Sequence, residues 1–254
     1  MTPSAEPRRG RSRTRRLALW LAVLVPAAGV AMVVVVRHEP VFYSRVVQAG
    51  AEQAAIGADA EVIEDMRRRA SARFVSTLAA LARDVARPGG WSTVLGDEEV
   101  NAWLAVELPL NHPELVPPGV ADLRVRCAPG AILLGCRFGG PLAAVAWVDV
   151  QVRLLEANRL AITVQQCRMG LLPLPTGLAA SRLAESLARS GLRCEVQRIA
   201  GQTQLVVQLP ATEIRGDQGG VVSWWLDGLR IEDGEVFLTG TSRRVQESRP
   251  GNGP

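Results

Sequence analysis

Residues 17–36 form a run of twenty residues without a charged side chain, and no other feature constrains the chain as strongly. A helix rises about 1.5 Å per residue, so this run spans roughly 30 Å, the thickness of the hydrocarbon layer of a bilayer. It predicts one transmembrane helix. The apolar stretch continues to Val36, well past small residues such as Ala27 where a signal peptidase would cut. This favours an uncleaved signal anchor over a cleaved signal peptide.

The 16 residues before this run form a basic tail that is expected to set its orientation. A basic segment next to a span stays on the cytoplasmic side of the membrane. The chain is therefore predicted to be a single-pass protein of a bacterial inner membrane, with a cytoplasmic N-terminus and a C-terminal domain outside the cytoplasm. The alternatives are an arm that contacts nucleic acid and a solvated tail without a partner. The topology-determining residues are Arg8, Arg9, Arg11, Arg13, Arg15 and Arg16.

The rest of the chain is close to neutral. The first 36 residues hold six arginines and one acidic residue, which leaves 23 arginines and 24 acidic residues beyond them. A nucleic-acid-binding domain needs a clustered basic surface, so this balance argues against one. The expected partners are the lipid bilayer and a bound lipid or envelope protein, with no nucleic acid.

Residues 37–90 are expected to form a connector and one long amphipathic helix. Acidic residues one turn earlier can pair with arginines of the run 67–69, so this run is interpreted as a solvated, salt-bridged face rather than a basic patch. The Pro-Gly-Gly sequence at 88–90 should end the helix. The apolar residues recur at steps of three and four, the period of a helix with one buried face: Ile63, Met66, Ala70, Phe74, Leu78, Leu81 and Val85.

Residues 91–242 are expected to form a domain built on antiparallel strands. Apolar and polar residues alternate through much of this region, as in strands with one buried face. Pro129-Gly130 suits the centre of a type II turn, and Asp233-Gly234 predicts a tight hairpin turn of type I′.

Two helices interrupt the strands. Asp97, Glu98 and Glu99 suit the first turn of a short helix, where acidic side chains complement the helix dipole and Asp97 can cap. An inserted helix is expected at about 177–190, after two prolines that exclude an earlier start. Residues 243–254 are expected to be a disordered tail.

These elements predict an α+β fold. One N-terminal transmembrane helix precedes an antiparallel, curved β-sheet that packs on the long amphipathic helix and on the short inserted helix.

The four cysteines of a domain outside the cytoplasm suggest disulfides. If the first turn has two residues, Cys127 faces Ile132, and Cys136 lies about 13 Å along the ladder, beyond the reach of a disulfide. Cys167 and Cys194 bracket the inserted helix and are the candidate disulfide. The alternative is four buried free thiols, and the spacing does not suit a zinc site.

The sequence predicts no enzyme, because the common motifs of nucleophilic, zinc-dependent and nucleotide-binding catalysis are missing. His38 lies at the membrane boundary, and His112 is interpreted as a loop residue rather than a base. The carboxylates at 97–99 point about 100° apart on a helix and cannot converge on one ion. No catalytic residue, metal ligand or cofactor is therefore predicted.

Trp224 and Trp225 are adjacent in a predicted strand, so their rings should lie on opposite faces of the sheet. One ring can lie in the core while the other contacts a bilayer surface, or both can pack within the protein. The pair is the candidate for contact with the membrane surface.

The order of the parts resembles a known group of proteins. The chain has a basic tail, a span and a helix, followed by DEEVNAWL at 97–104, GLLPLP at 170–175 and DGLRIEDGEV at 227–236. Residues 91–242 resemble membrane-anchored extracytoplasmic domains of the YpmS and LmeA types and relatives in planctomycete-like bacteria. These families are related to tubular lipid-binding (TULIP) domains. The resemblance implies a curved sheet around a long helix, an apolar interior and no catalytic residue.

We expect from these features a domain that binds lipid or another apolar ligand beside its own membrane, in cell-envelope maintenance. The alternative is a non-enzymatic scaffold that binds another membrane protein through the long helix or a sheet edge.

Overall fold

The structure, a computed structural model, describes residues 37–45, 60–116, 118–140, 143–199, 201–210, 214–215 and 220–245. The predicted basic tail and the predicted transmembrane segment 17–36 lie outside these ranges. Among the helices that are described, none combines the length and the apolar character needed to cross a bilayer.

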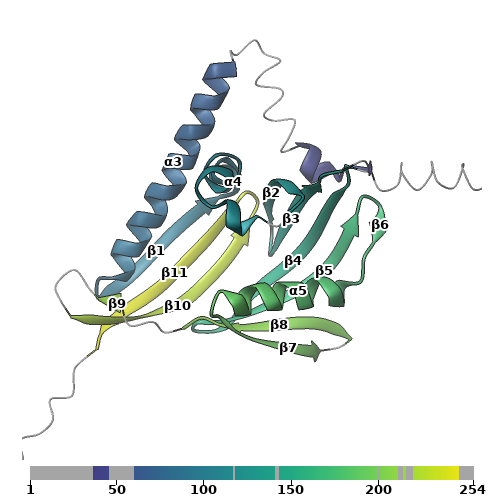
Figure 1. The fold of residues 1–254 in the computed structure, drawn as a ribbon. Helices are drawn as coiled ribbons and strands as arrows, with labels where there is room; N and C mark the ends of the chain where they lie inside the picture. Colours follow the sequence, from purple (N-terminus) through teal and green to yellow (C-terminus); the bar gives the residue numbers. More distant parts are fainter. Residues whose placement is uncertain are drawn as a thin grey trace, which may run out of the picture.

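The described chain has an α+β fold with antiparallel strands, which confirms the predicted class (Figure 1). Its strands form two sheets rather than the single sheet predicted. The four-stranded sheet has the order β1 (Gly89–Gly96), β11 (Glu235–Arg244), β10 (Val221–Glu232) and β9 (Ile214–Arg215). The seven-stranded sheet has the order β2 (Val120–Ala128), β3 (Ala131–Phe138), β4 (Val145–Glu156), β5 (Arg159–Met169), β8 (Gln202–Gln208) and β7 (Arg193–Ile199), with β6 (Leu172–Pro173) paired to β5.

Each sheet has its own helix. The long amphipathic helix α3 (Ala60–Val85) packs against β1 and against α4 (Asp97–Asn111). The inserted helix α5 (Thr176–Arg189) packs on β5, β7 and β8 of the larger sheet (Figure 1). A 3-10 turn, η1 (Pro113–Leu115), follows α4. The helices therefore lie where the sequence predicted them, but they do not share one sheet.

The predicted turn positions are confirmed, but the type I′ geometry expected at Asp233-Gly234 is wrong, because Gly234 has a positive φ and Asp233 does not. Cys127 pairs with Ile132 across the turn at Pro129-Gly130, as the two-residue register requires. Gly130 has a φ of +73°, and Gly234 in the β10–β11 turn has a φ of +84°, both in the region that favours glycine. The predicted start of the tail at residue 243 is wrong, because Arg243 and Arg244 still pair with β10.

Two apolar clusters hold the elements together. In the first, Val85 of α3, Trp91 and Leu226 pack with Leu154 and Leu160, so this cluster joins the four-stranded sheet to the ends of β4 and β5. In the second, Ala180 of α5 packs on the larger sheet with Val164 and Leu205.

The sheets meet through hairpin tips instead of a continuous ladder. Asn158, in the β4–β5 turn, is 2% exposed and donates its backbone N–H to the Leu226 carbonyl at 3.1 Å. Gly130, in the β2–β3 turn, donates to the carbonyl of Ile231 at 2.9 Å. Among the described residues, these backbone bonds between the sheets involve turns, and no strand of one sheet pairs with a strand of the other.

Candidate functional site

The chain enters the described domain through residues 37–45, which are held against β3 and β4. Tyr43 is fully buried, and its hydroxyl donates to the backbone carbonyl of Asp122 at 2.9 Å. Its ring lies over Gly135, where a Cβ atom would come within 2.8 Å of Tyr43 Cδ2. Glu39 accepts a hydrogen bond from Arg137 at 2.6 Å. Glycine at 135 is therefore what allows this segment to dock.

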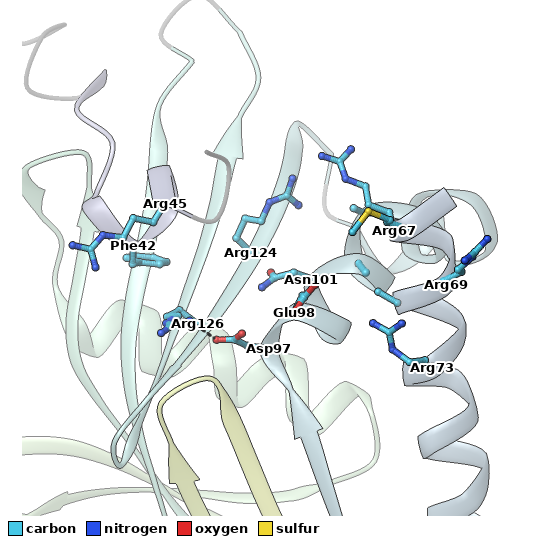
Figure 2. A pocket seen from close by; sticks show the side chains of 14 residues that line it. Phe42, Arg45, Arg67, Arg69, Arg73, Asp97, Glu98, Asn101, Arg124 and Arg126 are labelled. Atoms are coloured by element: carbon cyan, nitrogen blue, oxygen red, sulfur yellow. Dashed lines mark hydrogen bonds and ion pairs between the residues drawn. The ribbon is translucent and has the colours of Figure 1, made fainter. Parts of the chain in front are cut away.

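A pocket of about 760 Å³ opens between residues 41–45, α3, α4 and β2 (Figure 2). Part of its wall is apolar, formed by Phe42, Met66 and three alanines. Six of its other residues are arginines, whereas only two are acidic. The lining residues are Phe42, Arg45, Met66, Arg67, Arg69, Ala70, Arg73, Asp97, Glu98, Asn101, Ala102, Ala105, Arg124 and Arg126.

Asn101 fixes the position of α4 relative to β2. Its Nδ2 donates to the carbonyl of Val125 at 2.7 Å, and its Oδ1 accepts the backbone N–H of Val125 at 2.8 Å. Both bonds go to one residue in the middle of the strand. The helix and the strand that form the pocket floor are thus held in one register.

Asp97 anchors the start of α4 to the β2–β3 hairpin. Its carboxylate accepts the backbone N–H of Cys127 at 3.1 Å and lies 3.4 Å from Arg126. Burial is the largest influence and raises the pKa of Asp97, although the Cys127 hydrogen bond and the Arg126 charge lower it. The prediction that Asp97 caps its helix is wrong: Gly96 is the N-cap, and no side chain caps α4.

The arginines of the pocket differ in how far their charges are neutralised. Arg69 pairs with Asp65 at 2.6 Å, Arg73 pairs with Glu99 at 3.2 Å, and Arg126 lies between Asp97 and Asp233. Arg124 lies 4.0 Å from Asp122, at the limit of an ion pair.

Arg45 and Arg67 have neither an ion pair nor a hydrogen bond within the described ranges. Figure 2 shows Arg67 and Arg124 extending toward the same opening of the pocket. The opening therefore carries positive charge that the surrounding protein leaves available to an anion.

The sequence interpretation of the arginine run at 67–69 is confirmed for two of its members and wrong for the third. Arg68 pairs with Glu64 and Arg69 with Asp65 on the exposed face of α3. Arg67 has an isoleucine four residues earlier instead of an acidic residue and lines the pocket. The isoleucine at this position indicates from the sequence that Arg67 lacks the i,i+4 ion pair of its neighbours. The approach of Arg124 and Arg126 from β2, in contrast, depends on the tertiary fold.

The candidate disulfide between Cys167 and Cys194 is wrong, because both cysteines are free. Strand β8 lies between their strands, and Cys194 aligns through Val207 with Leu160 of β5. Across the sheet, Cys167 therefore lies two strand spacings from Cys194, about 10 Å. Along β5, it lies seven residues beyond Leu160, about 23 Å. A disulfide needs Cα atoms within about 7 Å. The other two cysteines are also free.

The two tryptophans lie on opposite faces of the four-stranded sheet, as their adjacency predicts. Trp224 packs in the first core cluster, with its ring 6.4 Å from that of Trp91. Trp225 lies beneath Arg243, whose guanidinium carbon is 5.7 Å from the ring centroid. Trp224 is thus the core ring of the pair, and contact of Trp225 with a membrane stays a prediction.

Residues considered for chemistry are dispersed. His38 is exposed, and the ring of His112 lies 6.0 Å from that of Trp103, tilted by 34°, with its Nδ1 3.7 Å from the exposed Glu114. Glu99 binds Arg73, Glu98 lines the pocket and Asp97 turns to β2, so the three carboxylates diverge. Within the described part of the chain, no group of three or more histidine, cysteine, aspartate or glutamate residues could hold a metal ion.

Comparisons with known proteins add no assignment: no family model, curated protein or solved structure matches this chain.

Proposed function

We propose that this protein is a single-pass membrane protein whose extracytoplasmic domain binds a lipid or a similar amphiphile. The observation that carries the proposal is the pocket between α3, α4, β2 and residues 41–45. Its volume of about 760 Å³ lies within the range of small-ligand sites. The uncharged run at 17–36 supports the anchor.

The chemistry of the lining selects an amphiphile over a purely polar ligand. Ala70, Ala102 and Ala105 provide a wall of small apolar side chains against which an acyl chain can pack. Arg67 and Arg124 at the opening provide positive charge for an acidic head group. An anion bound by arginine gains charge-assisted hydrogen bonds, which are roughly twice as strong as neutral ones.

A TULIP-like relationship and a role in cell-envelope maintenance belong to the same proposal. They are supported by the motifs at 97–104, 170–175 and 227–236 and by the predicted position of the domain beside the membrane.

Uptake of a fluorescent fatty acid by the delipidated full-length chain in a short-chain detergent tests this function. Ala105 is exposed and lines the pocket, so Ala105→Trp should fill the space at little cost to folding and abolish saturable uptake. Ala188→Trp, at an exposed position of α5, is the matched control and should bind like the parent.

Charge reversal tests the head-group part of the proposal. Arg67→Glu and Arg124→Glu should each weaken fatty-acid binding by roughly tenfold or more, because a hydrogen bond to a charged group is worth about 1.5–3 kcal/mol. Arg193→Glu, an exposed change outside the pocket, should have no effect. Equal uptake by Ala105→Trp and Ala188→Trp would rule out this pocket as the binding site.

A second candidate, a scaffold that binds another envelope protein, is favoured by strand β7. This strand ends the order of the seven-stranded sheet, and among the described strands it pairs with β8 alone. Val196 and Ile199 on it are 55% and 52% exposed. An exposed edge with apolar side chains suits the addition of a partner strand. Crosslinking from position 196 in native membranes would then recover a defined heteromeric product, and its loss when Ile199→Lys is added on the same strand would support this function.

A further inference from the structure

Exposed apolar side chains and pocket-lining arginines occur on the same two segments, residues 41–45 and the first turns of α3. Val41 is 63% exposed, Val62 is 49% exposed and Met66 is 48% exposed. Val62 and Met66 are four residues apart on α3 and so share one face of the helix. Arg67 follows Met66 directly and Arg45 follows Val41 by four residues; neither arginine has an ionic partner among the described residues. We refer to Val41, Arg45, Val62, Met66 and Arg67 as the α3 rim.

The α3 rim lies on the side where the chain leaves the predicted span. In Figure 1, residues 41–45, α4 and the start of α3 all lie along one edge of the molecule. Five residues separate Val36 from Val41, and an extended chain covers at most about 3.6 Å per residue. Val41 therefore lies within about 18 Å of the end of the predicted span.

The connection at this edge is held firmly by the domain. The buried Tyr43, its hydrogen bond to Asp122 and the 2.6 Å contact between Glu39 and Arg137 fix residues 39–43 on the larger sheet. A short segment that is fixed at both ends leaves the domain few orientations relative to the bilayer.

We propose that the α3 rim is a bilayer-contact surface, which rests on the anionic membrane surface and turns the pocket opening toward the lipid. This inference rests on the proposed single-pass topology. Apolar side chains flanked by arginines suit the interface of an anionic bilayer, where the arginines meet head groups and the apolar groups enter the acyl boundary. The start of β10 pairs with β9 at the far end of the molecule (Figure 1), and Trp225 follows the last residue of that pairing, Val222, by three positions. The proposal therefore assigns membrane contact to the α3 rim instead of the tryptophan pair.

Photocrosslinking of the full-length chain in vesicles of phosphatidylglycerol and phosphatidylcholine tests this surface. A photoreactive amino acid is placed at Val62 or at Met66, and the matched controls carry it at Val196 or Ile199, which are equally exposed on β7. We expect lipid adducts at 62 and 66 and only background at 196 and 199. Equal lipid labelling at all four positions, adducts to a second copy of the chain, or no adducts at 62 and 66 would overturn the proposal.

The arginines are tested in the same vesicles. Arg45→Gln together with Arg67→Gln should lower the lipid-adduct yield at Val62 roughly fivefold or more, and replacing phosphatidylglycerol by phosphatidylcholine should have a similar effect on the parent. An unchanged yield in both cases would overturn the role of charge.

Failure of this inference is distinguishable from failure of the proposed function. The Ala105→Trp variant blocks the pocket but leaves the α3 rim, so adducts at Val62 should persist when fatty-acid uptake is lost. Normal uptake without adducts at Val62 would overturn the contact surface and leave lipid binding in the pocket intact.

Discussion

The side chain of Asn158 joins the two sheets by bonding to the backbone on either side of Trp225, at Trp224 and Leu226. Its Oδ1 accepts the backbone N–H of Leu226 at 2.6 Å, and its Nδ2 donates to the carbonyl of Trp224 at 3.1 Å. Its own backbone is also bonded, to Leu226 and Leu209. Asn158 has a φ of +60°, which asparagine tolerates better than most residues. The side chain of Asn158 thus supplies hydrogen bonds between the two sheets at a place where their strands do not pair.

Replacing Asn158 by glycine should destabilise the fold without straining the backbone. Glycine keeps the positive φ but removes both side-chain bonds, which leaves the N–H of Leu226 unpaired in a buried site. We expect a loss of about 2–4 kcal/mol in the free energy of unfolding. Urea unfolding of the full-length chain in detergent, followed by circular dichroism, measures it. Asn158→Ala should lower the free energy of unfolding further, because alanine is strained at this positive φ whereas glycine is not. A loss below about 0.5 kcal/mol in Asn158→Gly would contradict this account.

A methyl group at Gly135 should displace the segment that precedes the domain. The added Cβ of Gly135→Ala would meet Tyr43 Cδ2 at 2.8 Å and Phe42 Cζ at 3.3 Å. Overpacking of this kind costs about 1–3 kcal/mol. Limited trypsin digestion should then cleave the variant at Arg37 or Arg45 faster than the parent. Gly130→Ala is not a suitable control because of its positive φ, whereas Gly90→Ala, with its nearest neighbour at 3.9 Å, should leave the cleavage rate unchanged.

Local patterns in the sequence were sufficient for the elements of the fold and insufficient for their arrangement. The helical period from Ile63 to Val85 predicted α3, and Pro129-Gly130 fixed the β2–β3 register. The division into two sheets depends on contacts between distant residues, such as Asn158 and Leu226, which no local pattern encodes.

The candidate site shows the same limit. Arg67 has an isoleucine four residues earlier, and among the described residues the nearby Glu64 pairs with Arg68 instead. The pocket, however, needs β2 to bring Arg124 and Arg126 opposite α3. The error at Cys167 and Cys194 has a similar origin: two cysteines that bracket α5 in the chain need not lie on neighbouring strands, and β8 lies between β5 and β7.

The thiols should differ in reactivity. Cys127 is 3% exposed, and burial, with a smaller contribution from Asp97, raises its pKa to about 11. Since the thiolate is the reactive form, Cys127 should be alkylated by iodoacetamide at pH 8 only after unfolding. Cys136, Cys167 and Cys194 are only half-buried and should all react before Cys127. Mass spectrometry of peptides after timed labelling measures this order, and denatured, non-reduced protein should bind four labels. A stable bond between Cys167 and Cys194 would reduce that number to two and would contradict the strand order.

The stability of the domain should depend on the protonation of Asp97. Burial raises the pKa of its carboxyl above the ordinary value of 3.8, so the folded state binds the proton more tightly than the unfolded state. The contribution of this group therefore favours folding at low pH and is lost as the pH rises from 3.8 through the raised pKa. Asparagine can still accept the Cys127 N–H bond but carries no charge to desolvate.

Asp97→Asn should consequently be at least as stable as the parent at neutral pH, with an advantage that disappears as the pH falls toward 3.8. Urea unfolding of both proteins over a pH series measures the difference between their curves. Asp233→Asn is the matched control, because Asp233 also pairs with Arg126 but its side chain is 73% exposed. The free energy of unfolding of this control should change with pH in the same way as that of the parent. If Asp97→Asn also runs parallel to the parent, the buried carboxyl does not titrate with a raised pKa, and its ion pair with Arg126 at 3.4 Å outweighs its burial.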